Sequence, residues 1–458
     1  MIEIALDAES RAAGGRLRRL AADLTPPKVL ALGFAGVILT GGILLTLPSA
    51  STSGESTDFL TALFTSTSAV CVTGLVVVDT GTHYSLWGQL VIMGLIQTGG
   101  LSFMTMASFL FLLMGKRIGL RERILIRESL NQVDVSGMVR LVRAVLIYAF
   151  GTEAVFAAIL TLRWLPDVGW PRALWLGIFH TISAFNNAGF DLMGEFRSLT
   201  GYVDDAIVVC AISSLFILGG IGFSVALNLW EWRERRLTTH SRLALRVTAV
   251  LIVAGSAILL LLEWSNTLAP LDGPGKLLGA YFTATTPRTA GFNTLDTAAL
   301  RPATQFLIVL LMFIGASPGS TGGGIKTTTF GLLTAAVWSQ GRGRDDVVIL
   351  GRRIAVEQVN RALAVTFLSS SLIVLVTLLL CLTEKADFLT LLFETVSAFG
   401  TVGLSMGITP KLSAFGRLLI IGTMYAGRVG PLTLVFALAQ SRRPQNGVRH
   451  VEDRVLIG

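Results

Sequence analysis

Long apolar runs alternate with short ones along this chain. The long runs lie at about 29–47, 86–114, 140–162, 203–230, 245–264, 303–316, 362–382 and 417–440. The short ones lie at 58–68, 171–183, 276–286 and 387–397. A long run suits a helix that crosses the roughly 30 Å hydrocarbon core of a bilayer, whereas a helix of about a dozen residues reaches only roughly 18 Å. Because non-helical backbone persists at that depth only where protein or water surrounds it, the short runs predict re-entrant segments.

The order long, short, long occurs four times, which predicts an internal repeat. The expected fold class is an all-α polytopic membrane protein of four membrane-pore-membrane repeats, with eight spans and four re-entrant pore helices around a pseudo-fourfold axis. We expect the repeats at 29–116, 139–233, 245–340 (with a broken last helix) and 361–441, between a basic cytoplasmic N-terminal segment at 1–28 and a cytoplasmic tail at 442–458.

The composition excludes several other classes of protein. Charged residues make up 14% of the 458 residues and hydrophobic ones 52%, whereas soluble proteins contain about 25% charged residues. So few charges cannot cover the surface of a soluble protein of this length, and so many hydrophobic residues exclude a disordered chain. The net charge is +8, and the Lys and Arg residues lie in short clusters between apolar runs. Clusters of this kind determine the orientation of membrane spans and do not indicate nucleic-acid binding. The three cysteines and four histidines lack disulfide or metal-ligand spacing.

A short motif follows each of the four short runs. The four copies read SAVCVTGL (68–75), SAFNNAGF (183–190), TTPRTAGF (285–292) and SAFGTVGL (397–404). A helix C-terminus carries roughly half a negative charge, so four of them aimed at one axis attract a cation. The extended segment after each helix can turn its carbonyls inward and replace the hydration shell of an ion, and glycine lets neighbouring loops approach closely. These motifs predict cation conduction.

A second repeated feature lies in the apolar run after each motif. Gly99-Gly100 matches Gly219-Gly220, and both pairs are expected to allow close helix packing. The third copy is replaced by a glycine-rich stretch at 315–324, and the fourth by the sequence Gly427-Arg428.

The charges also predict an orientation. Basic clusters lie at 11–28, 116–143, 233–246, 342–361 and 442–454, while the stretches where the short runs begin are acidic. Since cytoplasmic loops carry the excess of Lys and Arg, both termini are expected in the cytoplasm of a multi-pass protein of the cell inner membrane. The acidic outer side would raise the local concentration of cations.

The four motifs together resemble those of the Trk/Ktr/HKT superfamily of potassium transporters, and the chain looks closest to its Ktr-type membrane subunits. The resemblance covers about residues 28–458 and implies a K+ selectivity filter of backbone carbonyls. The implied filter residues are Cys71, Val72, Thr73, Gly74, Asn186, Asn187, Ala188, Gly189, Arg288, Thr289, Ala290, Gly291, Gly400, Thr401, Val402 and Gly403.

The same resemblance implies an intramembrane loop that gates the pore below the filter. The implied gating residues are Gly315, Ser317, Gly319, Ser320, Gly322, Gly323, Gly324, Lys326 and Arg428. A structural alternative for Arg428 and Lys326 is pairing with Glu394, Glu153 or carbonyls freed by the broken helix. The Arg288 side chain is expected to turn away from the pore and brace its loop, because a cation pointing inward would repel K+.

The predicted function is potassium uptake, Na+-dependent and under control of a cytosolic nucleotide-binding subunit of the RCK type, which the resemblance implies together with a homodimer. The alternative is a secondary transporter of another cation or small solute that uses broken helices. No set of catalytic residues is suitably spaced for an enzyme. No tightly bound cofactor is expected, only K+ in the filter and Na+ as a second candidate ion.

Overall fold

A computed structural model describes residues 26–102, 138–233, 236–344 and 346–431, together with Thr105, Met106, Ser108, Ile124 and Thr433. The tail at 442–458, nearly all of the N-terminal segment at 1–28 and most of the basic cluster at 116–143 lie outside the described residues. The described part is predominantly helical, as the sequence predicts.

The helices form four successive groups. The first two groups contain α2 (Pro26–Thr46), η1 (Pro48–Ala50), α3 (Phe59–Val70), α4 (Thr80–His83) and α5 (Leu86–Gly100), then α8 (Met138–Val168), α9 (Trp170–Phe185), η2 (Thr200–Tyr202), α10 (Ala206–Gly220) and α11 (Phe223–Trp230). The last two contain α12 (Thr239–Glu263), α13 (Gly273–Thr285), α14 (Pro302–Phe313) and α15 (Thr327–Gly341), then α16 (Val356–Thr383), α17 (Phe388–Gly400), η3 (Thr409–Lys411) and α18 (Ala414–Val429). Each of the four short apolar runs therefore holds a helix.

A small antiparallel hairpin separates the third and fourth groups. Its strands are β1 (Val348–Ile349) and β2 (Arg352–Arg353), and Val348 pairs with Arg353. The hairpin follows α15, and its β1 strand packs against that helix.

Polar residues at the helix starts explain several of these bounds. Asp58 accepts a hydrogen bond from the Thr61 amide at 3.1 Å at the start of α3, and Asp272 accepts one from the Gly275 amide at 2.7 Å at the start of α13. Such a cap satisfies an amide that has no partner within the helix and typically contributes about 1 kcal/mol. Two of the short helices are thereby fixed at their first residues.

Four helices in the described part are long and apolar enough to cross a membrane, namely α2, α8, α12 and α16, each the first of its group. Within the described residues, the second long helix is interrupted in the second and third groups. The sequence predicts a break only in the third group, where α14 and α15 are separated by residues 314–326. The structure also bends α10 against α11 by 103°, at Gly222, whose φ is +94°. The α5 and α18 helices end at Gly100 and Val429, and positive φ values follow at Ser102 (69°) and Gly430 (90°).

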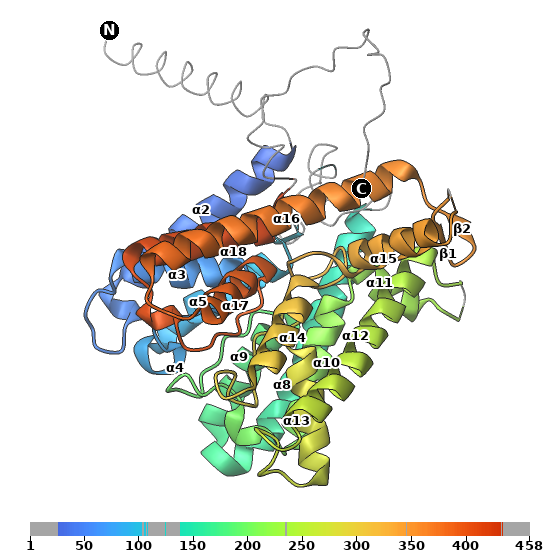
Figure 1. Ribbon diagram of the computed structural model, residues 1–458. Coiled ribbons are helices and arrows are strands. Elements are labelled where there is room, and N and C mark those ends of the chain that lie inside the picture. The colour runs from blue at the N-terminus through green and yellow to red at the C-terminus, as the bar shows by residue number, and fades with distance from the viewer. Residues whose placement is uncertain are drawn as a thin grey trace, which may run out of the picture.

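The groups close into a ring. Within each group, the first long helix packs on the short helix of the same group. Between groups, the second long helix packs on the short helix of the next group: α5 on α9, α10 on α13, α14 on α17, and α18 back on α3. Figure 1 shows the α2, α3, α5 and α16–α18 helices in one half and α8–α14 in the other. The short helices are therefore surrounded by the long ones.

Burial follows this arrangement. Large aromatic side chains of the short helices are almost fully buried, among them Phe64, Phe179 and Phe393. The long helices instead expose apolar side chains on their outer faces, such as Leu261 at 80% and Phe367 at 73%. Because water would oppose so much exposed apolar surface, these faces fit a hydrocarbon environment.

Candidate functional site

The four motif loops share an unusual backbone. In each loop the glycine has positive φ, and so does the residue two positions before it. The φ values are 50° at Val72, 58° at Asn187, 72° at Thr289 and 51° at Thr401, and 89°, 69°, 79° and 95° at Gly74, Gly189, Gly291 and Gly403. A residue other than glycine loses about 1–2 kcal/mol in this region, so four such residues at equivalent positions indicate one imposed geometry.

The four glycines lie against one another in a closed order, and we call them the glycine ring. A Cβ atom placed on each would collide with the carbonyl oxygen that precedes the next glycine. The distances would be 2.5 Å from Gly74 to the Ala188 oxygen, 2.8 Å from Gly189 to Ala290, 2.3 Å from Gly291 to Val402, and 2.1 Å from Gly403 to Thr73. The four loops therefore meet around one centre, with main-chain oxygens at every contact.

Hydroxyl groups at the ends of the short helices hold these loops. The Gly74 amide donates to Ser68 Oγ at 3.0 Å, and the Gly403 amide donates to Ser397 Oγ at 3.1 Å. In the second and third groups a hydroxyl near the helix end donates instead to the carbonyl just beyond the glycine. The loops are thus anchored to their own helices by a hydroxyl at the first motif position in three copies and at the second, Thr286, in the third.

Behind the second loop lies a buried polar cluster that sequence reasoning missed. Gln97 donates to both carboxylate oxygens of Glu153 at 3.1 Å, and Asn186 Nδ2 donates to Gln97 Oε1 at 2.7 Å and to Glu153 Oε1 at 3.1 Å. These residues come from α5, α8 and the end of α9, so no sequence spacing links them. The cluster ties the Asn186 side chain to two neighbouring helices.

The Arg288 side chain, in contrast, leaves its loop. Its Nη2 donates to Thr248 Oγ1 on α12 at 3.2 Å, and the residue is 7% exposed. This contact agrees with the prediction that Arg288 braces the third loop.

The second-helix glycines pack as the sequence predicts. A Cβ on Gly99 would lie 1.9 Å from the Val70 oxygen, and one on Gly219 would lie 1.9 Å from the Phe185 oxygen. The helix backbones therefore lie directly against the ends of the short helices.

Residues 314–326, which we call the inner loop, fold back on themselves between α14 and α15. The Gly315 amide donates to the Ile325 carbonyl at 2.9 Å, and the Ser317 and Thr327 hydroxyls lie 2.8 Å apart. A Cβ on Gly315 would lie 2.2 Å from the Gly323 oxygen, so the close approach requires glycine. The inner loop is a compact, closed segment.

The inner loop docks on the break between α10 and α11. The Ser317 amide donates to the Gly220 carbonyl at 2.9 Å, the Thr321 amide to the Gly219 carbonyl at 3.2 Å, and the Phe223 amide to the Gly319 carbonyl at 2.8 Å. Backbone groups that a continuous helix would satisfy internally are satisfied here by the inner loop. This explains why α10 and α11 are bent.

Two cations bond to carbonyls of the inner loop: Arg428, from α18, and Lys326, the last residue of the loop itself. Arg428 donates to the carbonyls of Thr321, Gly99 and Gly100, and Lys326 Nζ donates to the Gly322 carbonyl at 2.7 Å. Of the predicted alternatives for Arg428, pairing with carbonyls is the one observed, since Glu153 bonds to Gln97 and Asn186, and Glu394 to Ser405 and Thr409.

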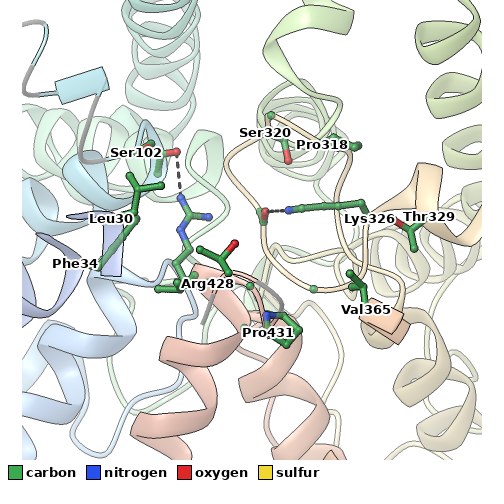
Figure 2. Close-up of a pocket in the computed structure, with 18 of the residues that line it drawn as sticks. Leu30, Phe34, Ser102, Pro318, Ser320, Lys326, Thr329, Val365, Arg428 and Pro431 are labelled. Atoms are coloured by element: carbon green, nitrogen blue, oxygen red, sulfur yellow. Dashed lines mark hydrogen bonds between the residues drawn. The ribbon is translucent and has the colours of Figure 1, made fainter. Parts of the chain in front are cut away.

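Both cations line a cavity of about 380 Å3 below the glycine ring. Its wall also includes Phe34, Arg361 and Pro431. Figure 2 shows the Arg428 guanidinium directed toward the segment that carries Ser102 and Lys326 directed toward its acceptor in the inner loop, each with a hydrogen bond drawn. Of the basic clusters of the sequence, the one at 342–361 contributes Arg361 to the wall of this cavity.

No group of three or more His, Cys, Asp or Glu residues within the described ranges could hold a metal ion. The atoms that lie against the four glycine positions are main-chain oxygens. Carbonyl oxygens of this kind can replace the hydration shell of a cation.

These features define an integral membrane protein, predominantly helical in its described part, in which four helical groups surround a ring of main-chain oxygens. The family model for TrkH, a cation transport protein, matches residues 34–446. The chain therefore belongs to the TrkH family of cation transport proteins, as its motifs predict. Since that family and the relatives below are transporters, the prediction that the chain is not an enzyme is confirmed.

Several known proteins are similar over nearly their whole length. The Ktr system potassium uptake protein B of Bacillus subtilis is 45% identical, covering 95% of this chain and 97% of that protein. The potassium/sodium uptake protein NtpJ of Enterococcus hirae is 40% identical, covering 96% and 99%. The crystal structure of the potassium transporter TrkH from Vibrio parahaemolyticus shares the fold, with a TM-score of 0.66 at 19% identity over 89% of this chain and 84% of that one.

Proposed function

We propose that this chain takes potassium ions up across the cell membrane through a filter of main-chain carbonyl oxygens. The observation that carries this proposal is the closed glycine ring, in which each loop places a carbonyl against the glycine of the preceding loop. The potassium uptake named for the relatives from Bacillus subtilis and Enterococcus hirae supports the choice of ion.

In this proposal the four helical groups are membrane-pore-membrane repeats with the sequence boundaries given above. Each first long helix is one span, and each second long helix, whether or not it is interrupted, is another, giving eight. The short helices α3, α9, α13 and α17 enter halfway and point their C-terminal ends at a pseudo-fourfold axis. The negative ends of four helix dipoles then stabilise a cation there.

The filter would consist of the sixteen loop residues named in the sequence analysis, acting through backbone carbonyls. A dehydrated K+ needs several oxygens in place of its water shell, and four loops supply them in layers. In each loop the sign of φ alternates, positive at the glycine and at the residue two positions earlier but not at the residue between them. This alternation turns successive carbonyls of one loop toward the same line, whereas in an ordinary extended strand they point to opposite sides.

The inner loop would be the gate. It lies under the ring, is bonded to the α10–α11 break, and is held on another side by Arg428. The positive charges of Arg428 and Lys326 beside the path would oppose a cation until the loop and these side chains move. The gating residues named from the sequence fall in this loop or contact it.

Orientation and partners follow from charge and family. In this proposal both termini lie on the cytoplasmic side of the inner membrane, as the basic clusters of the sequence favour, so that the gate faces inward. We propose a homodimer under control of a cytosolic, RCK-type nucleotide-binding ring, with Na+ stimulating K+ uptake and no tightly bound cofactor. The name of the Enterococcus hirae relative, a potassium/sodium uptake protein, is consistent with an involvement of Na+.

Purified protein in liposomes tests this function. Uptake of ⁸⁶Rb+ should be saturable, should be inhibited by external K+ more strongly than by Na+, and should rise when a low concentration of Na+ is added. Equal inhibition by K+ and Na+ would contradict a K+ filter, and uptake no greater than in protein-free vesicles would contradict transport altogether.

Shortening the inner loop tests the gate separately. Deleting residues 319–322 should raise ⁸⁶Rb+ flux, because the barrier under the ring is removed. The matched control removes Leu350 and Gly351 from the β1–β2 turn, which has no contact with the ring, and should leave flux unchanged. Equal flux in both deletion variants and the unaltered protein would remove the gating role.

A further inference from the structure

Three polar side chains lie directly beneath the glycine ring, and we call them the collar: Asn187, Thr289 and Thr401. Each occupies the positive-φ position two residues before its glycine, and each is completely buried. Asn187 Nδ2 donates to Thr289 Oγ1 at 3.2 Å. The collar therefore joins two filter loops by a side-chain hydrogen bond.

The inner loop is bonded to the collar as well. Thr321 Oγ1 lies 2.7 Å from Asn187 Oδ1, to which it donates, and the Gly323 amide donates to Thr401 Oγ1 at 3.1 Å. Thr321 itself is fully buried. The segment proposed as the gate and two loops of the proposed filter are thus one hydrogen-bonded unit.

Steric contact reinforces these bonds. A Cβ on Gly322 would lie 2.1 Å from Thr289 Oγ1, and one on Gly323 would lie 2.4 Å from Thr401 Oγ1. The inner loop is therefore seated on the collar with no space between them, and moving the loop must change the surroundings of the collar side chains.

The collar side chains also determine where carbonyls point. Asn187 has a φ of 58°, a conformation that its side chain must help to hold, since residues other than glycine disfavour it. The peptides on either side of Asn187 carry carbonyls of the second filter loop. When Asn187 Oδ1 loses its donor, a buried acceptor is left without a partner. This cost favours a rotation of the second filter loop that gives the oxygen a new partner.

The first loop differs. Its residue at the collar position is Val72, which offers no polar atom, and Arg428 bridges that side by binding the Gly99, Gly100 and Thr321 carbonyls. Thr321 thus contacts the filter through its hydroxyl and the arginine through its carbonyl. Thr321 is therefore bonded both to the filter, at Asn187, and to Arg428.

We propose that Thr321 is a positioning residue that couples the gate to the filter. With the inner loop seated, its hydroxyl fixes Asn187 and keeps the second filter loop in its K+-binding geometry. Displacement of the loop removes that bond and lowers the discrimination of K+ from Na+. By linkage, K+ in the filter in turn favours the seated loop. This inference rests on the proposed function and adds a specificity role to a residue of the gate.

The test is Thr321→Val, which keeps the shape of the side chain and removes its hydroxyl. In liposomes, the K+/Na+ preference, measured by competition against ⁸⁶Rb+, should fall roughly three- to tenfold, with a higher KM for K+. Thr321→Ser retains the hydroxyl and should restore the preference. Asn187→Gly, which tolerates positive φ, removes the partner and should reproduce the loss, and the double variant should be no worse than Asn187→Gly alone.

The matched control is Thr334→Val, the same substitution on α15, outside the inner loop. The Thr334 hydroxyl donates to the Phe330 carbonyl at 2.9 Å, within its own helix, and has no bond to the collar. This variant should leave both the rate and the K+/Na+ preference unaltered. Size-exclusion chromatography of each variant checks that it remains folded. Thr321→Ala, which also lacks the hydroxyl, takes the place of Thr321→Val if that variant does not fold, and the same loss of preference is expected.

The outcomes separate this inference from the proposed function. A faster Thr321→Val with unchanged K+/Na+ preference would leave the gate in place and overturn the coupling. An unchanged rate and preference would overturn it as well, and so would additive effects of Thr321→Val and Asn187→Gly. A failure of the proposed function would appear instead in the unaltered protein, as a lack of K+ preference.

Discussion

In the glycine ring every helical group contributes the same backbone, a positive-φ residue, one intervening residue and a positive-φ glycine. Directly beneath it, the groups contribute different parts: a break at Ser102, a 103° bend at Gly222, the inner loop, and Arg428. Coordination of a spherical ion by four loops requires equivalent geometry. A gate requires one element that can move while the others hold it. The two layers differ because these requirements differ.

The ring should tolerate alteration least. In Gly403→Ala, the new methyl group would lie 2.1 Å from the Thr73 carbonyl oxygen, at a residue whose φ is 95°. Since a displacement of about 1 Å at a reacting or binding group can cost on the order of 100-fold, K+ uptake should fall by about that factor. Liposome flux of ⁸⁶Rb+ measures it.

Gly422→Ala is the control for that variant. Gly422 lies on α18 in the same group, and no atom lies within 4 Å of the position where its Cβ would be. Uptake should remain near that of the unaltered protein. If Gly403→Ala transported as well as Gly422→Ala, the ring would not be the place where ions are coordinated.

The layer beneath should respond in the opposite direction. Arg428→Gln removes a charge and most of the bonds to the Thr321, Gly99 and Gly100 carbonyls, so the inner loop loses one of its supports. Flux should increase, on the order of tenfold, because hydrogen bonds to charged groups are among the stronger ones. The initial rate of ⁸⁶Rb+ uptake is the measurement.

Arg417→Gln provides the comparison on the same helix. Arg417 bonds to Thr61 and to the carbonyls of Pro410 and Leu412, at the opposite end of α18. It does not contact the inner loop, and flux should stay near the starting value. A decrease of flux in Arg428→Gln would mean that the arginine assists conduction, and the asymmetric layer would then need another role.

The sequence predicts the ring far better than the layer beneath it. The glycines are recognisable because the motif occurs four times with similar neighbours, and repetition is a strong signal. The positive φ at Val72 and Thr401 is not, since β-branched residues disfavour it and only the packed loops impose it.

The asymmetric layer depends on contacts between groups, which no local pattern records. Residues 203–230 read as one apolar run, yet α10 and α11 are bent because the inner loop supplies partners for their freed backbone groups. Thr321 was likewise missed, since it lies among glycines with no periodic spacing. Its role follows only from the two residues that it joins, Asn187 and Arg428.

The smallest expected effect tests whether the ring acts through backbone alone. Cys71 lies at the end of α3, is fully buried, and its amide donates to the Thr67 carbonyl at 2.8 Å. If its carbonyl is the group that faces the ion, Cys71→Ala should alter K+ uptake and the K+/Na+ preference by less than about twofold. Cys210→Ala, at an exposed position of α10, is the matched control for loss of a thiol. A larger change in preference for Cys71→Ala than for Cys210→Ala would show that side chains shape the first loop's ion contacts, and the ring would then be less uniform than its backbone.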